Sequence, residues 1–131
     1  MPATQGAEAA SSIKWESEKM SVLKGLYELI CERRNNPAPN SYTGYLFEKG
    51  LDKILKKCGE ESAEMIIAAK NSESDPGGTE LKNEVADLIY HIMVLCAECG
   101  LDWEEVEKTL DERGKKTGNL KQFHNSENDM L

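Results

Sequence analysis

The sequence predicts an all-α fold, a bundle of four to five helices. Apolar residues recur at helical spacing in several segments, and short stretches rich in Gly, Pro, Asn and Asp separate these segments. No segment shows the strict alternation of apolar and polar residues that a half-buried strand requires. The chain has 131 residues, of which 39% are hydrophobic, so its length and composition suit a single globular domain.

Composition also divides the chain and predicts where its first helix lies. Residues 1–19 are rich in Ala, Ser and Gly without a sustained period and are expected to form a flexible N-terminal arm. The domain is expected to span residues 20–118, and residues 119–131 to form a C-terminal tail. A first helix is predicted over residues 20–35, before Asn36-Pro37. Its apolar face consists of Val22, Leu23, Leu26, Tyr27 and Ile30.

A short helix and a long helix are predicted next. Ser41 or Thr43 can cap the short helix, which is expected to end near Phe47. After Gly50 the long helix is predicted to run to Asn71. Its expected apolar stripe consists of Leu51, Ile54, Leu55, Cys58, Met65, Ile66 and Ala69. Residues 72–78, which include a Pro-Gly-Gly sequence, are expected to form a connector.

Two further helices complete the predicted bundle. Thr79 is expected to cap the first of them, and Gly100 to end it in a left-handed conformation. Asp102 is expected to open the last helix, which runs to about residue 116 with Val106 and Leu110 facing inward. Apolar residues on both long helices extend beyond a single stripe. Four helices alone would leave much of this surface in water, so a homodimer is expected.

The charge balance limits the kinds of partner. The chain carries 24 Asp and Glu against 16 Lys and Arg, a formal net charge of -8. Because nucleic acids are bound by neutralising their phosphates with basic side chains, no nucleic-acid partner is expected. No apolar run approaches the roughly 18 residues of a membrane span, and four dispersed cysteines fit a reducing compartment. A cytoplasmic protein with no membrane partner is therefore expected.

Acidic residues recur at helical spacing on the two long predicted helices. They are Glu60, Glu61 and Glu64 on the first helix, and Glu84 and Asp87 on the second. Two facing helices can bring these carboxylates to one place. Like charges at such a distance are tolerated mainly where a divalent cation neutralises them, and oxygen ligands select Mg²⁺ or Mn²⁺. Solvated acidic faces are common on helices, however, so spacing alone leaves a surface role open for each carboxylate.

Basic residues and one histidine lie close to this acidic group. Lys49, Lys53 and Lys57 recur every four residues, which suits a phosphorylated substrate. Pairing of these lysines with nearby glutamates along the same helix is the alternative. His91 lies one turn after Asp87, beside an apolar stripe, where a histidine is more often a satisfied structural residue than a ligand.

Taken together, these motifs resemble those of the phosphoribosyl-ATP pyrophosphatase family. The matching residues are Ser41-Tyr42-Thr43, Phe47, Lys49-Gly50, Asp52-Lys53-Ile54, Lys56-Lys57, Gly59-Glu60-Glu61, Glu64, Ala68-Ala69-Lys70, Glu84, Ala86-Asp87-Leu88 and Tyr90-His91. The acidic motif is shared with the wider superfamily of MazG-like nucleotide pyrophosphatases. The Ser-Tyr-Thr and Lys-Gly-x-Asp-Lys segments narrow the resemblance to this one family.

The resemblance implies a dimeric MazG-like helical bundle that hydrolyses phosphoribosyl-ATP to phosphoribosyl-AMP and pyrophosphate in histidine biosynthesis, with Mg²⁺ as cofactor. The implied catalytic residues are Glu60, Glu61, Glu64, Glu84 and Asp87, of which all but Glu60 hold metal. Glu60 is expected to support the ligands or to act as general base. The implied substrate-binding residues are Tyr42, Lys53, Lys56, Lys57 and His91. Two alternatives remain, a house-cleaning nucleoside triphosphate pyrophosphatase and a non-enzymatic acidic helical interaction module.

Overall fold

The computed structural model describes residues 22–116, and all regular structure in that range is helical, as predicted. Residues 22–35 form the described part of the first helix. The other elements are α2 (Tyr42–Lys49), α3 (Leu51–Lys70), the short 3-10 helix η1 (Ser72–Ser74), α4 (Thr79–Glu98) and α5 (Trp103–Gly114). The predicted N-terminal arm (1–19) and C-terminal tail (119–131) lie outside the described residues. None of the helices within residues 22–116 has the length and apolar character needed to cross a membrane.

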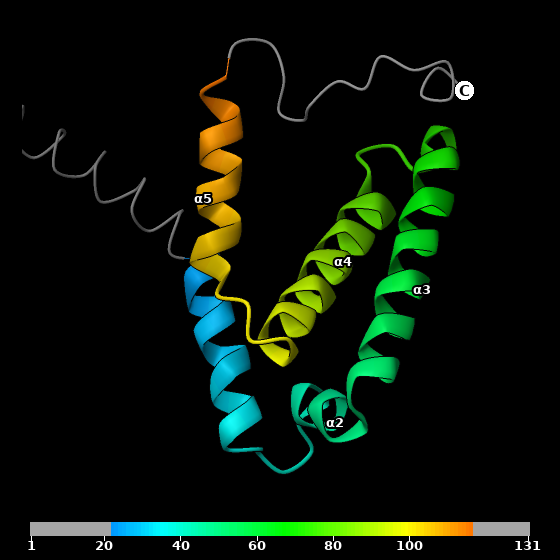
Figure 1. Ribbon diagram of the computed structural model, residues 1–131. Helices are drawn as coiled ribbons and strands as arrows, with labels where there is room; N and C mark the ends of the chain where they lie inside the picture. Colours follow the sequence, from blue (N-terminus) through cyan, green and yellow to red (C-terminus); the bar gives the residue numbers. More distant parts are fainter. Residues whose placement is uncertain (1–21, 117–131) are drawn as a thin grey trace, which may run out of the picture.

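α3 and α4 form an antiparallel hairpin, and this hairpin positions the candidate site. In Figure 1 the two helices lie on the right, and α2 lies across their lower ends. The helix of residues 22–35 and α5 form a second arm on the left of the same view. α3 and α4 pack closely against each other, whereas α5 contacts α4 much less and buries only Trp103. The molecule therefore has one tightly packed pair of helices and one arm attached mainly at its base.

The hydrophobic core lies where the helix of residues 22–35 meets α2, α3, α4 and the start of α5. Its most buried side chains are Ile30, Leu46, Ile54, Met93 and Val94, with Trp103 at the edge.

The helix of residues 22–35 also forms hydrogen bonds with the end of α4 and with the residues just before α5. The guanidinium of Arg34 donates to the carbonyl oxygens of Ala97 and Glu98 in the last turn of α4. The Tyr27 hydroxyl donates to the carbonyl oxygen of Leu101, 2.6 Å away, just before α5 begins.

Local signals explain most helix ends. The Ser41 hydroxyl accepts a hydrogen bond from the backbone N–H of Gly44, so Ser41 caps α2. Gly100 has a positive φ of 71°, as predicted for the residue that ends α4. The predicted cap at Thr79 is wrong, because Thr79 is the first residue of α4 itself. Asp75 caps this helix instead, since its carboxylate accepts from the backbone N–H of Glu80 at 2.9 Å.

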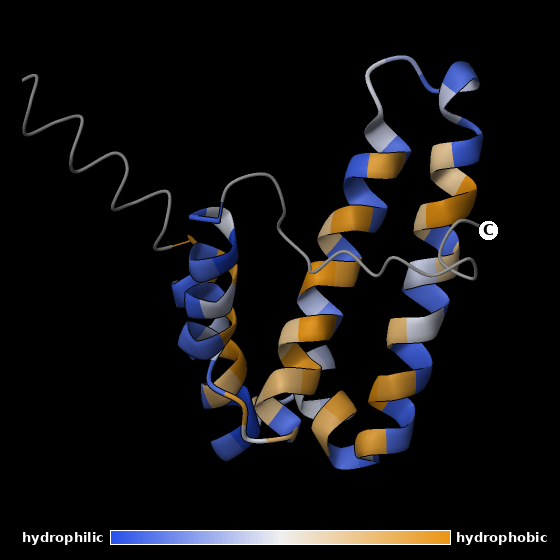
Figure 2. Cartoon of the chain, turned by 45° about the horizontal axis from the view of Figure 1, so that its top comes forward, coloured by the Kyte–Doolittle hydropathy of each residue, from blue (hydrophilic) through white to orange (hydrophobic). Residues whose placement is uncertain are grey.

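The side chains that the long helices bury differ from those predicted to face the core. On α3, Ile54, Glu61 and Ala68 are buried at intervals of seven residues. Side chains that were expected to face inward are exposed, namely Leu51, Leu55 and Ile66 on α3 and Leu110 on α5. Figure 2 shows apolar residues along the visible sides of both α3 and α4. A single copy of the chain thus leaves a large apolar surface uncovered on the hairpin.

Gly50 joins α2 to α3 with φ 90° and ψ -172°, a conformation that only glycine adopts without strain. We expect Gly50→Ala to lower the free energy of unfolding by about 1–3 kcal/mol, because a Cβ atom makes this conformation unfavourable. Urea denaturation at one fixed protein concentration measures the change.

Gly59→Ala is the matched control, because Gly59 lies inside α3 and an added Cβ meets no atom within 4 Å. Alanine favours the helix, so this variant should gain roughly 0.5–1 kcal/mol. An equal loss of stability in both variants would contradict the assignment of strain to residue 50.

Candidate metal centre

Three carboxylates from two helices meet midway along the α3–α4 hairpin. One oxygen atom from each of Glu61, Glu84 and Asp87 lies within 4.8 Å of the other two. Glu61 comes from the buried arc of α3, while Glu84 and Asp87 lie one turn apart on α4. Glu61 is buried, Glu84 is half-buried and Asp87 is exposed. The group is therefore closed on the side of Glu61 and open to solvent on the side of Asp87.

Two carboxylate oxygens of this group are buried without a partner. Within residues 22–116, Glu61 Oε2 and Glu84 Oε2 have no hydrogen bond. A buried carboxylate oxygen without a hydrogen bond is costly, and the cost grows when a second negative charge is adjacent. A divalent cation between the two helices would remove both costs. Because the donors are all oxygens, the set fits Mg²⁺ or Mn²⁺ better than a softer metal.

The pKa of Glu84 reflects the crowding of the carboxylates. Burial raises the pKa of its carboxyl group, and a hydrogen bond to Glu64 and the charges of Glu64, Glu61 and Asp87 raise the pKa further. Ionisation of Glu84 therefore opposes folding in the absence of a cation. Its stabilising contribution is present at acid pH and is lost as the pH rises through the pKa of the folded state. Glu64 is exposed and lies outside the group of three carboxylates.

Lys57 places a positive charge beside Glu61, the buried member of the three carboxylates. Its Nζ lies 3.5 Å from Glu61 Oε1 and 3.3 Å from Glu60 Oε2. Burial alone lowers the pKa of Lys57, but the hydrogen bond to Glu60 and the neighbouring Tyr42 and Glu61 raise it above its ordinary value overall. The ammonium group thus stays charged and partly neutralises the buried side of the site.

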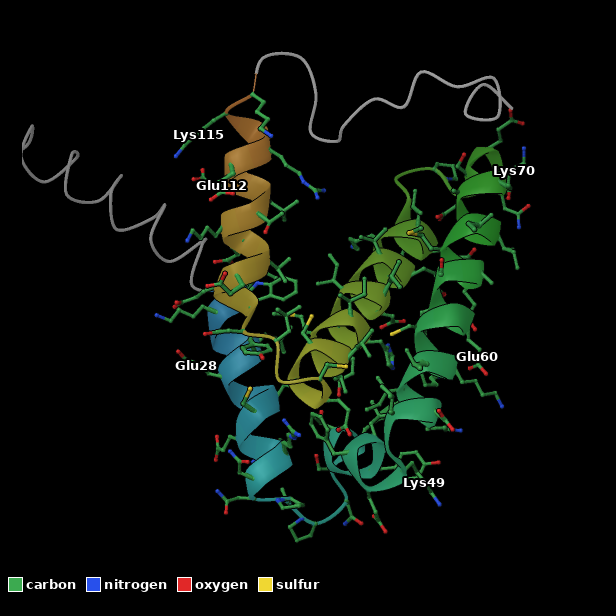
Figure 3. The ribbon with its side chains drawn as sticks, in the orientation of Figure 1. Glu28, Lys49, Glu60, Lys70, Glu112 and Lys115 are labelled. Atoms are coloured by element: carbon green, nitrogen blue, oxygen red, sulfur yellow. The ribbon has the colours of Figure 1, made fainter. Side chains whose placement is uncertain are left out.

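Glu60 and the other predicted lysines lie outside the three-carboxylate group. Figure 3 places Glu60 on the side of α3 that faces away from α4. One of its oxygens pairs with Lys57 and the other lies 3.8 Å from Lys56 Nζ. Lys53 is half-buried one turn before Lys57, and it forms no ion pair with any residue that the structure describes.

His91 and Tyr42 connect the acidic group to α2. The buried His91 ring lies 2.7 Å from the carbonyl oxygen of Asp87 through Nδ1 and 3.1 Å from the Tyr42 hydroxyl through Nε2. A second hydrogen bond joins the hydroxyls of Thr43 and Tyr90 across the same two helices. Sequence spacing placed His91 near the acidic residues. The spacing could not predict that His91 contacts α2, because Tyr42 and His91 are 49 positions apart in the sequence.

Comparison with known proteins gives a consistent set of relatives. A family model described as phosphoribosyl-ATP pyrophosphohydrolase matches residues 23–114. A protein named phosphoribosyl-ATP pyrophosphatase from Clostridium botulinum is 52% identical over 103 residues, which cover 79% of this chain and 90% of the relative. A protein of the same name from Clostridium novyi is 48% identical over 104 residues, covering 79% and 91% of the two chains. Another, from Limosilactobacillus fermentum, is 49% identical over 104 residues, covering 79% and 92%.

Proposed function

The chain belongs to the phosphoribosyl-ATP pyrophosphohydrolase family, and from this membership we propose that it hydrolyses phosphoribosyl-ATP to phosphoribosyl-AMP and pyrophosphate. The observation that best supports the proposal is the group formed by Glu61, Glu84 and Asp87, with its two unpaired buried oxygens. Such a group suits a phosphoanhydride substrate, whose cleavage depends on positioning and on compensating negative charge. The proposed role is in histidine biosynthesis, in the cytoplasm.

Mg²⁺ is the proposed cofactor, with Mn²⁺ as a substitute. Glu61, Glu84 and Asp87 would hold it, and Glu64, one turn after Glu61 on the exposed side of α3, is a further ligand candidate. When bound, the cation supplies polarisation of the phosphate oxygens and increases the acidity of a water molecule. The open side at Asp87 leaves room for the substrate.

The basic residues of α3 are proposed to contact the substrate phosphates. Lys57 already lies beside Glu61, so a polyphosphate that reaches the carboxylates also meets an ammonium group. Lys57, Lys56 and Lys53 are proposed to stabilise the charge that builds up on the departing pyrophosphate. Glu60 pairs with Lys56 and Lys57, which supports a role in holding these two lysines rather than a role as general base.

The substrate assignment is tested by measuring pyrophosphate release in Mg²⁺ with phosphoribosyl-ATP and with a panel of canonical and non-canonical nucleoside triphosphates. We expect kcat/KM to be highest for phosphoribosyl-ATP and activity to disappear when EDTA removes the cation. Faster turnover of any triphosphate in the panel would favour a house-cleaning pyrophosphatase. No turnover of any of these substrates would favour a non-enzymatic acidic module.

We further propose that two copies of the chain associate through the hairpin. Ile66 and Ile67 on α3 are 57% and 59% exposed, and Val85, Ile89 and Ile92 extend the apolar surface across α4. A contiguous apolar surface of this kind is uncommon on a monomer and typical of an interface between subunits. A second copy is the proposed occupant because it brings an apolar surface of the same kind.

A further inference from the structure

Two exposed tyrosines and a lysine share one side of α2. Tyr42, Tyr45 and Lys49 follow one another at intervals of one helical turn, so their side chains lie on the same side of the helix. Tyr42 and Tyr45 are 43% and 42% exposed, and Lys49 is exposed as well. We call these three residues the α2 face. Packing within residues 22–116 leaves its aromatic surface open to solvent.

The α2 face already holds one cation against an aromatic ring. The Nζ atom of Lys49 lies 5.7 Å from the centre of the Tyr45 ring, whose electron-rich face attracts positive charge. Lys49 forms no ion pair with the residues that the structure describes, so its charge is available to an anion. The Tyr42 and Tyr45 rings, with centres 6.2 Å apart and planes inclined by 37°, form an angled wall. A flat ring and an anion are therefore the two groups that suit this face.

The α2 face begins next to the carboxylates and leads away from them. The Tyr42 hydroxyl lies 3.1 Å from Nε2 of the His91 ring, and Nδ1 of that ring lies 2.7 Å from the carbonyl oxygen of Asp87. A single imidazole ring thus separates Tyr42 from the backbone of a candidate metal ligand. From Tyr42 the face follows α2 for about 10 Å to Lys49, at 1.5 Å per residue. Figure 3 places Lys49 at the lower end of the hairpin, below Glu60.

The substrate of the proposed reaction carries its groups in a matching order. Phosphoribosyl-ATP has a triphosphate on one side of its purine and, on the other side, a second ribose with a phosphate of its own. When the triphosphate meets the carboxylates, the purine follows, and the second phosphate lies farthest from them. Ordinary nucleoside triphosphates lack this second phosphate, so a group that binds it distinguishes the two kinds of substrate.

We propose that the α2 face is the subsite for the phosphoribosyl-adenine half of the substrate, with the purine stacked on Tyr45 beside Tyr42 and Lys49 paired with the phosphate of the phosphoribosyl group. The proposal rests on the proposed function, because this phosphate belongs to phosphoribosyl-ATP. The flexible side chain of Lys49 leaves the Tyr45 ring as the purine arrives and turns to the phosphate. Stacking holds any purine, whereas the ion pair forms only with a substrate that carries the second phosphate.

Two substitutions of Tyr45 test the stacking. Tyr45→Leu removes the aromatic ring and should raise KM for phosphoribosyl-ATP by about 3- to 10-fold. The contact lies away from the reacting phosphorus and is the same in the ground state and the transition state, so kcat should change less than about twofold. Tyr45→Phe is the matched control, because it keeps the ring and the Tyr45 hydroxyl forms no hydrogen bond with residues 22–116. Its KM should equal that of the wild type.

Lys49→Met tests which phosphate the lysine binds. It should raise KM for phosphoribosyl-ATP by about 5- to 20-fold and weaken inhibition by phosphoribosyl-AMP by the same factor, while inhibition by AMP stays unchanged. AMP lacks only the phosphoribosyl group, so the ratio of the two inhibition constants isolates that group. Tyr45→Leu should instead weaken both inhibitors alike. Lys70→Met is the charge control and should change neither constant, because Lys70 is an exposed lysine at the opposite end of α3 (Figure 3).

Equal effects of Lys49→Met on the two inhibitors, or equal effects of Tyr45→Phe and Tyr45→Leu on KM, would overturn the proposal. An unchanged KM in Lys49→Met or in Tyr45→Leu would also overturn it. Both positions are exposed, so these variants should keep the helical circular dichroism of the wild type. A wild-type protein that does not hydrolyse phosphoribosyl-ATP would instead contradict the proposed function. Calorimetric titration of the same variants with phosphoribosyl-AMP and AMP would then still test the subsite.

Discussion

Glu61→Gln is expected to abolish the response of the protein to Mg²⁺ and to lower kcat/KM for phosphoribosyl-ATP by about 10²- to 10⁴-fold. Glutamine has the shape of glutamate but lacks its charge, so packing in the buried arc of α3 is retained. The lost charge belongs to the carboxylate of α3 that lies closest to Glu84 and Asp87 in the group of three. Calorimetric titration with Mg²⁺ and the kinetics of pyrophosphate release measure the two effects.

The fold should survive this substitution, because glutamine keeps the shape of the buried side chain and removes its repulsion with the neighbouring carboxylates. One oxygen of the Glu61 carboxylate is buried and unpaired next to other carboxylates, and neutralising it relieves repulsion with Glu84. Helical circular dichroism should therefore be unchanged. Glu80→Gln is the control, since it removes an exposed carboxylate one turn before Glu84 on the same helix. Equal Mg²⁺ affinity in Glu61→Gln and the wild type would show that the ion binds elsewhere.

The core variant Ile54→Ala is expected to have the largest effect on stability. Ile54 is 0% exposed, and its neighbours in the core come from the other helices of the bundle. Truncation to alanine removes buried methyl and methylene groups and leaves a cavity, which lowers the free energy of unfolding by about 2–5 kcal/mol. Urea denaturation monitored by circular dichroism measures this loss.

The adjacent Leu55 provides a control that also tests the dimer. Leu55 is 46% exposed on the side of α3 that a single copy leaves uncovered, so Leu55→Ala should cost less than about 1 kcal/mol of folding free energy within one chain. If a second copy covers this face, the same variant should raise the dissociation constant of the dimer by about tenfold in sedimentation equilibrium. A wild-type protein that sediments as an active monomer would contradict the proposed dimer.

Sequence patterns predicted the helices well because the signals that define a helix are local. Ser41 and Asp102 have side chains that reach the free N–H groups of their own helices, and Gly100 supplies the left-handed residue that ends α4. The cap of α4 was predicted at the wrong residue because its acceptor comes from Asp75, across a turn. Such a contact depends on the path of the connector, which spacing alone does not determine.

The candidate site was harder to predict because its geometry depends on which arcs of two helices face each other. The position of Glu61 in the sequence indicates a carboxylate on a helix, but its burial follows from how α3 packs on α4. Spacing grouped Glu60 with Glu61, whereas the packing of the hairpin separates them, leaving Glu60 beside two lysines. The contact between Tyr42 and His91 joins distant parts of the chain and has no signature in either segment.

The α3–α4 hairpin also has a consequence for how the chain folds. The carboxylates of Glu61 and Asp87 are only 26 positions apart in the sequence, and the two helices that carry them are joined by a short connector. Contacts between neighbouring segments form early in folding, because little loop entropy is lost. The carboxylates should therefore approach one another as the hairpin closes, and we expect their repulsion to slow that step. A divalent cation bound at this stage would relieve the repulsion, so we expect the ion proposed for the site to speed the folding of the two helices that build it.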